Sequence, residues 1–429
     1  MGMIMDSTLP ISEARKRRCT TEDDIRRSEV NESLSPSEVA SSITRGIHRA
    51  LPSAAVRAVP LADGGEGFAR ALVAATRGTL HPVTVTGPVG EPVLAHYGIL
   101  GDIDNSSNNN NNNKADERTP TTTQPTTKTA VIDIASAAGL ALVPPHARDP
   151  TTTTTFGVGQ LIAAALAAGA QRIVIGAGDS GTSDAGAGML QALGARLLDA
   201  HGRELPRACG GAALRALADV DVGGLDQRLR GVRIEAPCNW RNVLCGPNGV
   251  ARVYGPQKGA TEAQVEVLAR ALEVYAEVVG GRLGVEVAEV PGGGASGGLG
   301  AGLLVLGARL RPRYEAVMEY FGIGDLFEEE GGCQLVVTAE GGLDGQTPRG
   351  KIPAEVASRA KAVGIPVIAL AGTVGRDAGV NYGAGIDAFT SILRGPTTLD
   401  EAIGQAEDLL VDAAESAMRM VMVGMAMRV

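Results

Sequence analysis

Four glycine-rich turns that carry acidic or hydroxyl side chains are the parts of this chain best suited to chemistry. They span residues 62–67, 176–188, 291–298 and 340–351. Glycine lets backbone N–H groups approach an anion closely, and the N-terminus of a following helix favours negative charge. Carboxylates in the same turns can hold Mg²⁺ against phosphates. A single turn of this kind is weak evidence, because tight turns also use glycine for steric reasons, but four of them predict a phosphate site.

Two further polar segments, 237–249 and 254–260, are dense in amide side chains. Asn239, Asn242, Gln257 and Lys258 are suited to binding a small polyhydroxy acid, although a structured loop that satisfies its own backbone groups explains them equally well. The stretch 345–352 nearly matches a P-loop, but Ile352 stands where Mg²⁺ binding requires Ser or Thr. We therefore reject a standard P-loop and retain Lys351 as a candidate phosphate contact.

The composition excludes several other functions. The formal net charge of −9 argues against nucleic acid as the main partner, because binding to a duplex needs a basic surface. The five His residues lie outside every glycine-rich turn, and the five Cys residues show no CxxC spacing, so a His-based triad, a zinc site and a disulfide scaffold are all disfavoured. The chain has no apolar run of the ~20 residues that a membrane span needs. We expect a cytoplasmic α/β protein with no membrane partner.

The elements that must position these turns alternate between helix and strand. A capping box at Ser35 and Glu38 predicts a helix over 36–50, and an apolar stripe predicts another over 262–279. The other expected helices span 67–76, 157–168, 185–194 and 399–417. The expected strands span 56–63, 97–100, 130–135, 172–178, 233–237, 334–340, 366–372 and 387–392. This alternation predicts parallel sheets with active residues at the carboxyl ends of the strands.

Three segments do not follow the pattern. Residues 1–32 are interpreted as a poorly ordered tail, and 103–129 as a disordered Asn/Thr-rich insertion within a domain, because almost nothing in it is apolar. The Met-rich C-terminal segment 418–429 favours core packing or a frayed tail over membrane insertion.

The motifs, taken together and in order, resemble the glycerate kinase family of the glycerate 2-kinase type. The matching stretches are 32–47, 60–68, 154–162, 175–199, 255–261, 291–303 and 340–357. The Asn-rich insertion and the form of segment 237–260 look like the eukaryotic, fungal-type branch of the family. Any one stretch alone would be a weak signal, but the ordered set is specific.

The resemblance implies a two-domain α/β fold. A Rossmann-like domain would be formed by both chain ends, residues 33–77 and 290–429, and a second α/β domain, 78–289, would be inserted within it. ATP and glycerate would bind in the cleft between the two domains.

The resemblance also implies the site residues. Asp184 would act as general base or Mg²⁺ ligand beside Asp179 and Ser180, and Asp184→Ala should then reduce turnover without unfolding the protein. Lys258 would attract the glycerate carboxylate or the transferring phosphate. Asp63 and Glu66 would contact Mg²⁺ or substrate, and Asn239 and Asn242 would contact substrate. The backbone N–H groups of Gly293, Gly294 and Ser296 would bind the nucleotide phosphate. Glu340, Asp344 and Lys351 would lie on the loop that faces this phosphate.

The implied reaction is ATP-dependent phosphoryl transfer to D-glycerate, with 2-phosphoglycerate the favoured product and homo-oligomerisation left open. Some positions depart from the family pattern. Members of the family usually begin with an apolar strand that leads to a Lys. In this chain the strand and the Lys are absent or displaced, and Asn31 stands in the place of the Lys. Asp179, Ser183 and Gly342 also replace residues that are commoner in the family. Two alternatives therefore remain: a kinase of another small hydroxy acid, and a catalytically impaired ligand-binding paralogue.

Overall fold

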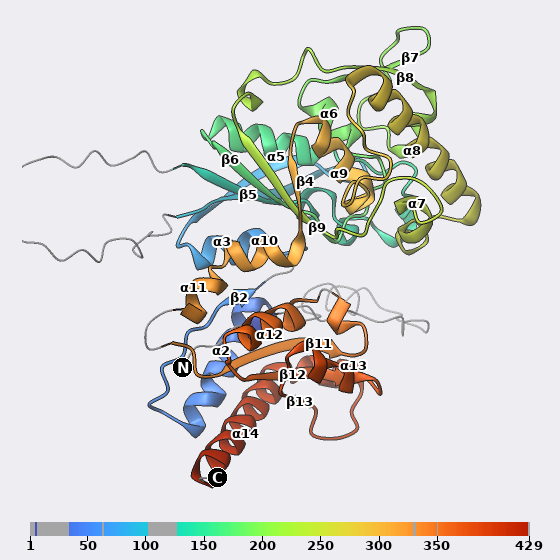
Figure 1. The fold of residues 1–429 in the computed structure, drawn as a ribbon. Helices are drawn as coiled ribbons and strands as arrows, with labels where there is room; N and C mark the ends of the chain where they lie inside the picture. Colours follow the sequence, from blue (N-terminus) through green and yellow to red (C-terminus); the bar gives the residue numbers. More distant parts are fainter. Residues whose placement is uncertain are drawn as a thin grey trace, which may run out of the picture. The chain divides into compact units, whose positions relative to one another are not determined.

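The computed structural model describes residues 5–6, 34–61, 64–101, 127–328, 332–349 and 351–427, which form an α/β protein (Figure 1). Its backbone contacts divide the chain into two compact units, Gly64–Arg313 and a unit of both chain ends, Met1–Asp63 with Tyr314–Val429. This division differs from the expected boundaries, because 64–77 and 290–313 group with the inserted unit. Most of the expected tail and most of the Asn/Thr-rich insertion lie outside the described residues.

The inserted unit is built on a six-stranded sheet in the order β10-β9-β6-β5-β4-β3. The strands are β3 (Thr79–Thr86), β4 (Pro92–Ile99), β5 (Thr129–Asp133), β6 (Arg172–Gly176), β9 (Arg233–Cys238) and β10 (Arg309–Pro312). The first four in that order, β10, β9, β6 and β5, pair in parallel, whereas β4 and β3 add an antiparallel hairpin at one edge. The sequence analysis missed β3, whose side chains are mostly half-buried or exposed and form no apolar run.

The helices of this unit contribute apolar faces to one core around the sheet. They are α3 (Phe68–Ala75), α4 (Ala135–Ala138), α5 (Phe156–Ala167), α6 (Ala187–Ala192), α7 (Val250–Tyr254), α8 (Glu262–Leu283) and α9 (Ala295–Val305). The predicted stripe on α8 is confirmed, since Leu268, Leu272 and Tyr275 are completely buried. A small antiparallel pair, β7 (Arg196–Asp199) and β8 (Leu217–Asp221), packs beside α8.

The unit of the chain ends contains the parallel sheet β11-β12-β13. Its strands are β11 (Val336–Leu343), β12 (Val367–Val374) and β13 (Ala388–Ser391). A short strand β1 (Met5–Asp6) pairs in parallel with β2 (Pro60–Leu61) and contacts β11. A first strand is thus present far upstream of the position at which the sequence analysis looked for it, while the expected strand over 56–63 is reduced to Pro60–Leu61.

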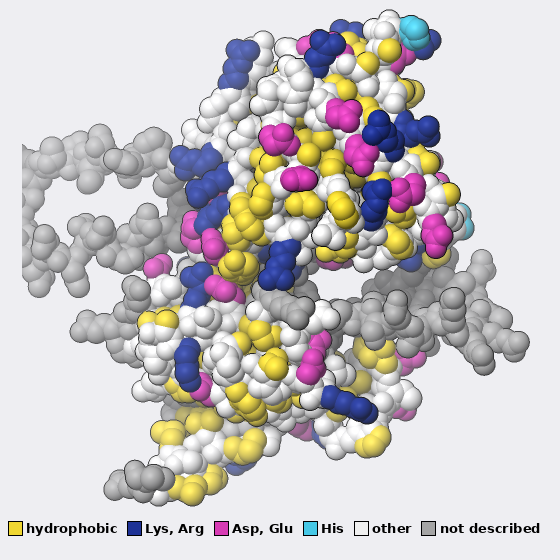
Figure 2. All heavy atoms as spheres, turned by 45° about the vertical axis from the view of Figure 1, so that its right-hand side comes forward, with side chains coloured by type: hydrophobic (Ala, Val, Ile, Leu, Met, Phe, Trp, Pro, Cys, Tyr) yellow, Lys and Arg dark blue, Asp and Glu magenta, His cyan; other side chains and the backbone are white. Residues whose placement is uncertain are grey.

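The helices of this unit are α2 (Pro36–Ala50), α10 (Arg313–Tyr320), α11 (Ile323–Glu328), α12 (Ile352–Ala362), α13 (Leu399–Gly404) and α14 (Ala406–Ala426). The first residue of α10, Arg313, is the last residue of the inserted unit. The expected closing helix over 399–417 is in fact two helices that meet at Gln405. The second continues through the Met-rich segment, where Met418 is buried and Met420, Met425 and Met427 are exposed. Figure 2 shows hydrophobic side chains gathered at this end of α14. Among the described helices, none has the length and apolar character to cross a membrane.

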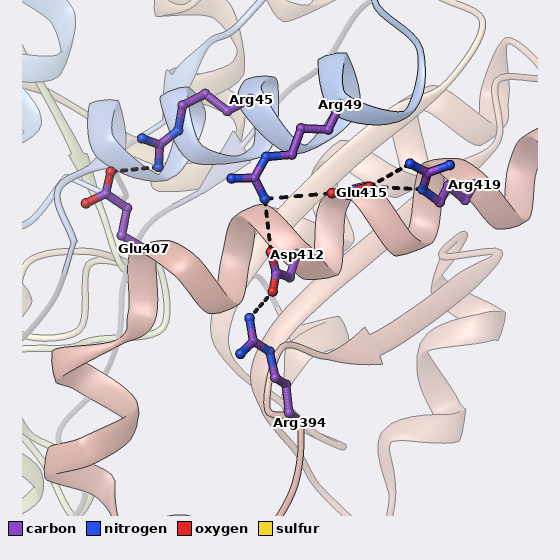
Figure 3. A network of polar contacts seen from close by, with 7 residues as sticks. All are labelled: Arg45, Arg49, Arg394, Glu407, Asp412, Glu415 and Arg419. Atoms are coloured by element: carbon purple, nitrogen blue, oxygen red, sulfur yellow. Dashed lines mark hydrogen bonds and ion pairs between the residues drawn. The ribbon is translucent and has the colours of Figure 1, made fainter.

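Helices α2 and α14 pack closely and join the two ends of the chain. The predicted capping box of α2 is confirmed, and Ile43 and Ile47 belong to the same core cluster as Leu410 and Ala414. Ion pairs flank this contact, including Arg45–Glu407 at 2.7 Å and Arg49–Asp412 at 3.1 Å (Figure 3). Because these side chains are roughly half exposed, such pairs contribute little, and the apolar packing holds the helices together.

Gly46 allows this close approach and gives a test of it. A Cβ atom at Gly46 would collide with the carbonyl oxygen of Val411 and would lie 2.7 Å from Ala414 Cβ. We expect Gly46→Ala to lower the free energy of unfolding by about 1–3 kcal/mol, measured by urea denaturation, because overpacking forces the helices apart. Gly424→Ala on α14 is the control, since nothing lies within 4 Å of its added Cβ. Equal stability of the two variants would contradict the proposed tight contact.

Candidate functional site

A cavity of about 300 Å³ lies in the inserted unit beyond the carboxyl ends of the four parallel strands. Segments that directly follow each strand line it: Ala135 after β5, Ala177–Ser180 after β6, Asn239 after β9 and Arg313 after β10. Ligand sites of parallel α/β sheets occur at this edge, because the strands deliver their connecting loops there together. The cavity is therefore the candidate active site of this unit.

The cavity brings together many of the polar residues that the sequence analysis selected. Its polar lining comprises Glu66, Asp179, Ser180, Asn239, Asn242, Tyr254, Gln257, Lys258, Ser296 and Arg313. Three of the four glycine-rich turns thus meet at one cavity, together with both amide-rich segments. The result is a small, polar space that holds two cationic side chains and two carboxylates.

The turn at 64–67 is held by two carboxylates from neighbouring strand ends. Buried Asp133 accepts hydrogen bonds from the N–H groups of Gly67 (3.1 Å) and Ala69 (2.6 Å). Asp179, in the left-handed region with φ 50°, accepts from the N–H of Glu66 at 2.9 Å. Burial raises the pKa of Asp133 to about 7, and the amide hydrogen bonds act in the opposite direction. The arrangement fixes the backbone that carries Glu66 at the cavity.

Asp184 has surroundings that differ from those expected for a general base or a Mg²⁺ ligand. Its carboxylate is 1% exposed and accepts from Thr155 N–H (2.8 Å), Thr155 Oγ1 (2.9 Å), Gly186 N–H (3.1 Å) and Gly188 N–H (3.2 Å). It does not belong to the cavity lining. Burial raises its pKa, and the hydrogen bonds from Thr155 and the glycines oppose that rise. The geometry makes Asp184 a buried anchor of its loop, since Oδ2 accepts three of these bonds and Oδ1 one, and its expected role as base or Mg²⁺ ligand stays a prediction.

Lys258 lies in the short 3-10 helix η6 (Pro256–Lys258) and is 3% exposed although it lines the cavity. Its Nζ donates to Ser180 Oγ at 2.9 Å and to the carbonyl oxygen of Thr182 at 2.6 Å. Burial lowers its pKa to about 7, and the negative charge of Asp184 acts in the opposite direction. A buried lysine that faces a cavity and is only partly charged at neutral pH is a candidate for direct participation in chemistry.

The third turn contributes Ser296 but not the two glycines before it. Ser296, Gly297 and Gly298 have consecutive left-handed φ angles of 52°, 70° and 91°, and the buried Ser296 Oγ has no hydrogen-bond partner in the described structure. By contrast, Gly293 N–H donates to Val290 and Gly294 N–H donates to Asn242. The expectation that these two amides bind a phosphate is not met, because both are used within the protein.

The fourth turn belongs to the unit of the chain ends. Lys351 Nζ lies 3.2 Å from Glu340 Oε1 and 3.8 Å from Asp344 Oδ1, and it donates to the Gly342 carbonyl oxygen. These three predicted residues do form one cluster, and their nucleotide contact stays a prediction. Asp63 lies outside the described residues.

Among the described residues, no group of three or more His, Cys, Asp or Glu side chains could hold a metal ion by itself. The predicted Mg²⁺ contact of the pair Asp179 and Asp184 stays a prediction, since one or two carboxylates hold this ion only together with substrate phosphates. The sequence analysis also missed Arg313, which lines the cavity. Its position directly after a parallel strand, β10, was the signal that could have revealed it.

Comparison with known proteins identifies relatives that share one family description. Residues 25–422 match the family model described as the glycerate kinase family. The chain is 44% identical to glycerate 2-kinase of Escherichia coli K12 over 395 residues, covering 92% of this chain and 96% of the relative. It is 43% identical to glycerate kinase of Bacillus subtilis 168, covering 88% and 92% respectively.

The fold has a close counterpart among solved structures. A crystal structure from Salmonella typhimurium LT2, whose description names glycerate kinase 2, matches with a TM-score of 0.76 and 40% identity, covering 92% of this chain and 96% of that chain. The α/β fold class is thereby confirmed. The expected fungal-type branch is not supported, since these relatives are bacterial.

The surroundings of Asp184 change what its removal should do. We expect Asp184→Ala to lower the free energy of unfolding by about 3 kcal/mol or more, because several buried donors lose an acceptor at about 1–3 kcal/mol each. Urea denaturation and limited proteolysis of the inserted unit measure the effect. Glu66→Ala is the control, since that side chain is exposed at the same cavity. An Asp184→Ala protein as stable as the control would show that the carboxylate is not a structural anchor.

Proposed function

The chain belongs to the glycerate kinase family, and from this membership we propose that it transfers the γ-phosphoryl group of ATP to a hydroxyl group of D-glycerate. The product proposed is 2-phosphoglycerate, in accordance with the glycerate 2-kinase name of one relative. The cavity of the inserted unit is the proposed acceptor site.

The observation that carries the acceptor assignment is the grouping of a guanidinium and an amine with amide side chains in a small cavity. Arg313 and Lys258 line a space of about 300 Å³ together with Asn239 and Asn242. A guanidinium group matches a carboxylate with two parallel hydrogen bonds, and amides suit hydroxyl groups. The cavity is at the small end of ligand sites, which fits a three-carbon acid better than a whole nucleotide.

The phosphoryl donor needs charge neutralisation, since phosphoryl transfer depends mainly on positioning and electrostatic stabilisation. We assign Ser296 to a phosphate oxygen, because its buried hydroxyl lacks a partner at the cavity. Lys351, with Glu340 and Asp344, is assigned to nucleotide contact. Mg²⁺ commonly uses one or two carboxylates together with substrate phosphates, and Glu66 and Asp179 are the carboxylates at the cavity that fit this pattern.

The reaction can be tested directly with the purified protein, ATP, Mg²⁺ and D-glycerate. We expect ADP release that depends on glycerate, and a product that enolase converts without a mutase, because enolase accepts 2-phosphoglycerate and not the 3-isomer. A requirement for the mutase would assign the 3-product instead. ADP release with another small hydroxy acid but not with glycerate would favour the first alternative. Nucleotide binding without turnover on any such acid would favour the impaired paralogue.

The role of Arg313 gives a prediction specific to the acceptor. We expect Arg313→Gln to raise KM for glycerate about tenfold or more, because a charged hydrogen bond contributes about 1.5–3 kcal/mol, while KM for ATP changes little. Steady-state kinetics with each substrate varied in turn provide the measurement. The matched control is Arg252→Gln on α7, whose side chain pairs with Glu266 and does not line the cavity. Equal effects of the two substitutions on KM for glycerate would contradict the assignment.

A further inference from the structure

Transfer of a phosphoryl group to a hydroxyl releases the hydroxyl proton, and the structure bears on which group accepts it. Asp184, the expected base, accepts three hydrogen bonds at Oδ2 from Thr155 and Gly188 and one at Oδ1 from Gly186, and it lies outside the cavity lining. The acceptor must therefore be sought among the titratable groups that do line the cavity. These are Glu66, Asp179, Tyr254, Lys258 and Arg313.

Four of these groups are less suited than Lys258. Arg313 cannot lose a proton under protein conditions. Tyr254 donates its hydroxyl hydrogen to Asn242 Oδ1 at 3.1 Å. Asp179 accepts the N–H of Glu66, and Glu66 itself is exposed, so both carboxylates are committed to the turn or to solvent and are the better candidates for contact with Mg²⁺.

The geometry of Lys258 is suited to accepting a proton. Two acceptors, Ser180 Oγ and the Thr182 carbonyl oxygen, take two of the N–H bonds of the amine. A tetrahedral nitrogen then has one further direction, which in a neutral amine holds the lone pair. Lys258 is 3% exposed and is one of the residues that line the cavity, so we assign this remaining direction to a ligand bound there.

We propose that Lys258 is the general base that removes the proton from the acceptor hydroxyl of glycerate. In the step, the hydroxyl oxygen forms a bond to the γ-phosphorus, and the bond from that phosphorus to the β,γ-bridging oxygen breaks to leave ADP. The hydroxyl proton passes to Nζ, which becomes an ammonium beside the new phosphate. The ammonium returns the proton to solvent after the product leaves. This inference rests on the proposed function.

The charges around Lys258 agree with this role. Burial lowers its pKa to about 7, so a large share of the amine is neutral at neutral pH. The negative charge of Asp184, in the loop between β6 and α6, raises the pKa of Lys258. The other charged residues that line the cavity are the carboxylates Asp179 and Glu66 and the cation Arg313. Bound anions favour the ammonium form, so the lysine should be a stronger base in the complex than in the free enzyme.

The pH dependence follows with a definite sign. The base must be neutral, so kcat/KM should fall as the pH drops through about 7, where the Lys258 amine of the free enzyme becomes protonated. We call this fall at low pH the acidic limb of the pH profile. The corresponding limb of kcat should lie at higher pH, because bound anions raise the pKa of the lysine. Asp133 also has a pKa of about 7 and could produce a similar limb, so it needs its own control.

The test measures kcat/KM for glycerate in the wild-type protein, Lys258→Arg, Lys258→Met and Asp133→Asn over about pH 5.5–9.5. We expect both Lys258 variants to lose about 100-fold or more and to lack the limb, because Arg keeps the charge but cannot accept a proton. Asp133→Asn should keep the limb, whatever its rate. Circular dichroism and thermal unfolding check that each variant is folded.

The outcomes separate this inference from the proposed function. If Lys258→Arg retains most of its activity, a fixed charge suffices and the general-base assignment falls, while the kinase function stands. If Lys258→Arg does not fold, the wild-type, Lys258→Met and Asp133→Asn profiles decide. A limb that survives in Lys258→Met, vanishes in Asp133→Asn or is absent from the wild type overturns the inference. A folded wild-type protein with no activity on glycerate overturns both.

Discussion

The buried carboxylate of Asp184 is the constraint on which the rest of the site depends. An ionised group in the interior is costly unless donors surround it, and here the donors come from two places in the chain. Thr155 precedes α5, whereas Gly186 and Gly188 form the start of α6. The carboxylate thus ties the threonine segment to the second glycine-rich turn. Ser180, which receives the Lys258 hydrogen bond, lies in that same turn.

The parallel pairing of β10, β9, β6 and β5 determines which loops can cooperate. Because parallel strands end at the same edge, residues after Asp133, Gly176, Cys238 and Pro312 reach one cavity despite their separation in sequence. The antiparallel hairpin of β4 and β3 extends the sheet without adding a loop to the cavity lining. The chemistry of the unit is therefore concentrated at the parallel half of the sheet.

Periodicity and glycine-rich turns predicted most parallel strands and helices such as α2 and α8, because an amphipathic helix or a doubly covered strand such as β6 carries its pattern locally. Helices α9 and α12 were missed. The site was predicted in part. Glu66, Ser180 and Lys258 meet at the cavity as expected. The turn that contains Asp184 gave no signal that this side chain is enclosed, since its burial depends on the distant Thr155. Likewise, the internal bonds of the Gly293 and Gly294 amides depend on Val290 and Asn242, which only the folded loop brings close.

The separation of the two buried charges has a chemical consequence. Within the described residues, Lys258 and Asp184 do not hydrogen-bond to each other; the lysine donates to Ser180 and Thr182, while the aspartate accepts from amides and a hydroxyl. A direct ion pair would strongly favour the ammonium form and would occupy the nitrogen. With the carboxylate satisfied elsewhere, its field raises the pKa of the lysine without preventing deprotonation. The enclosure of Asp184 and the availability of the Lys258 amine are therefore two results of one arrangement.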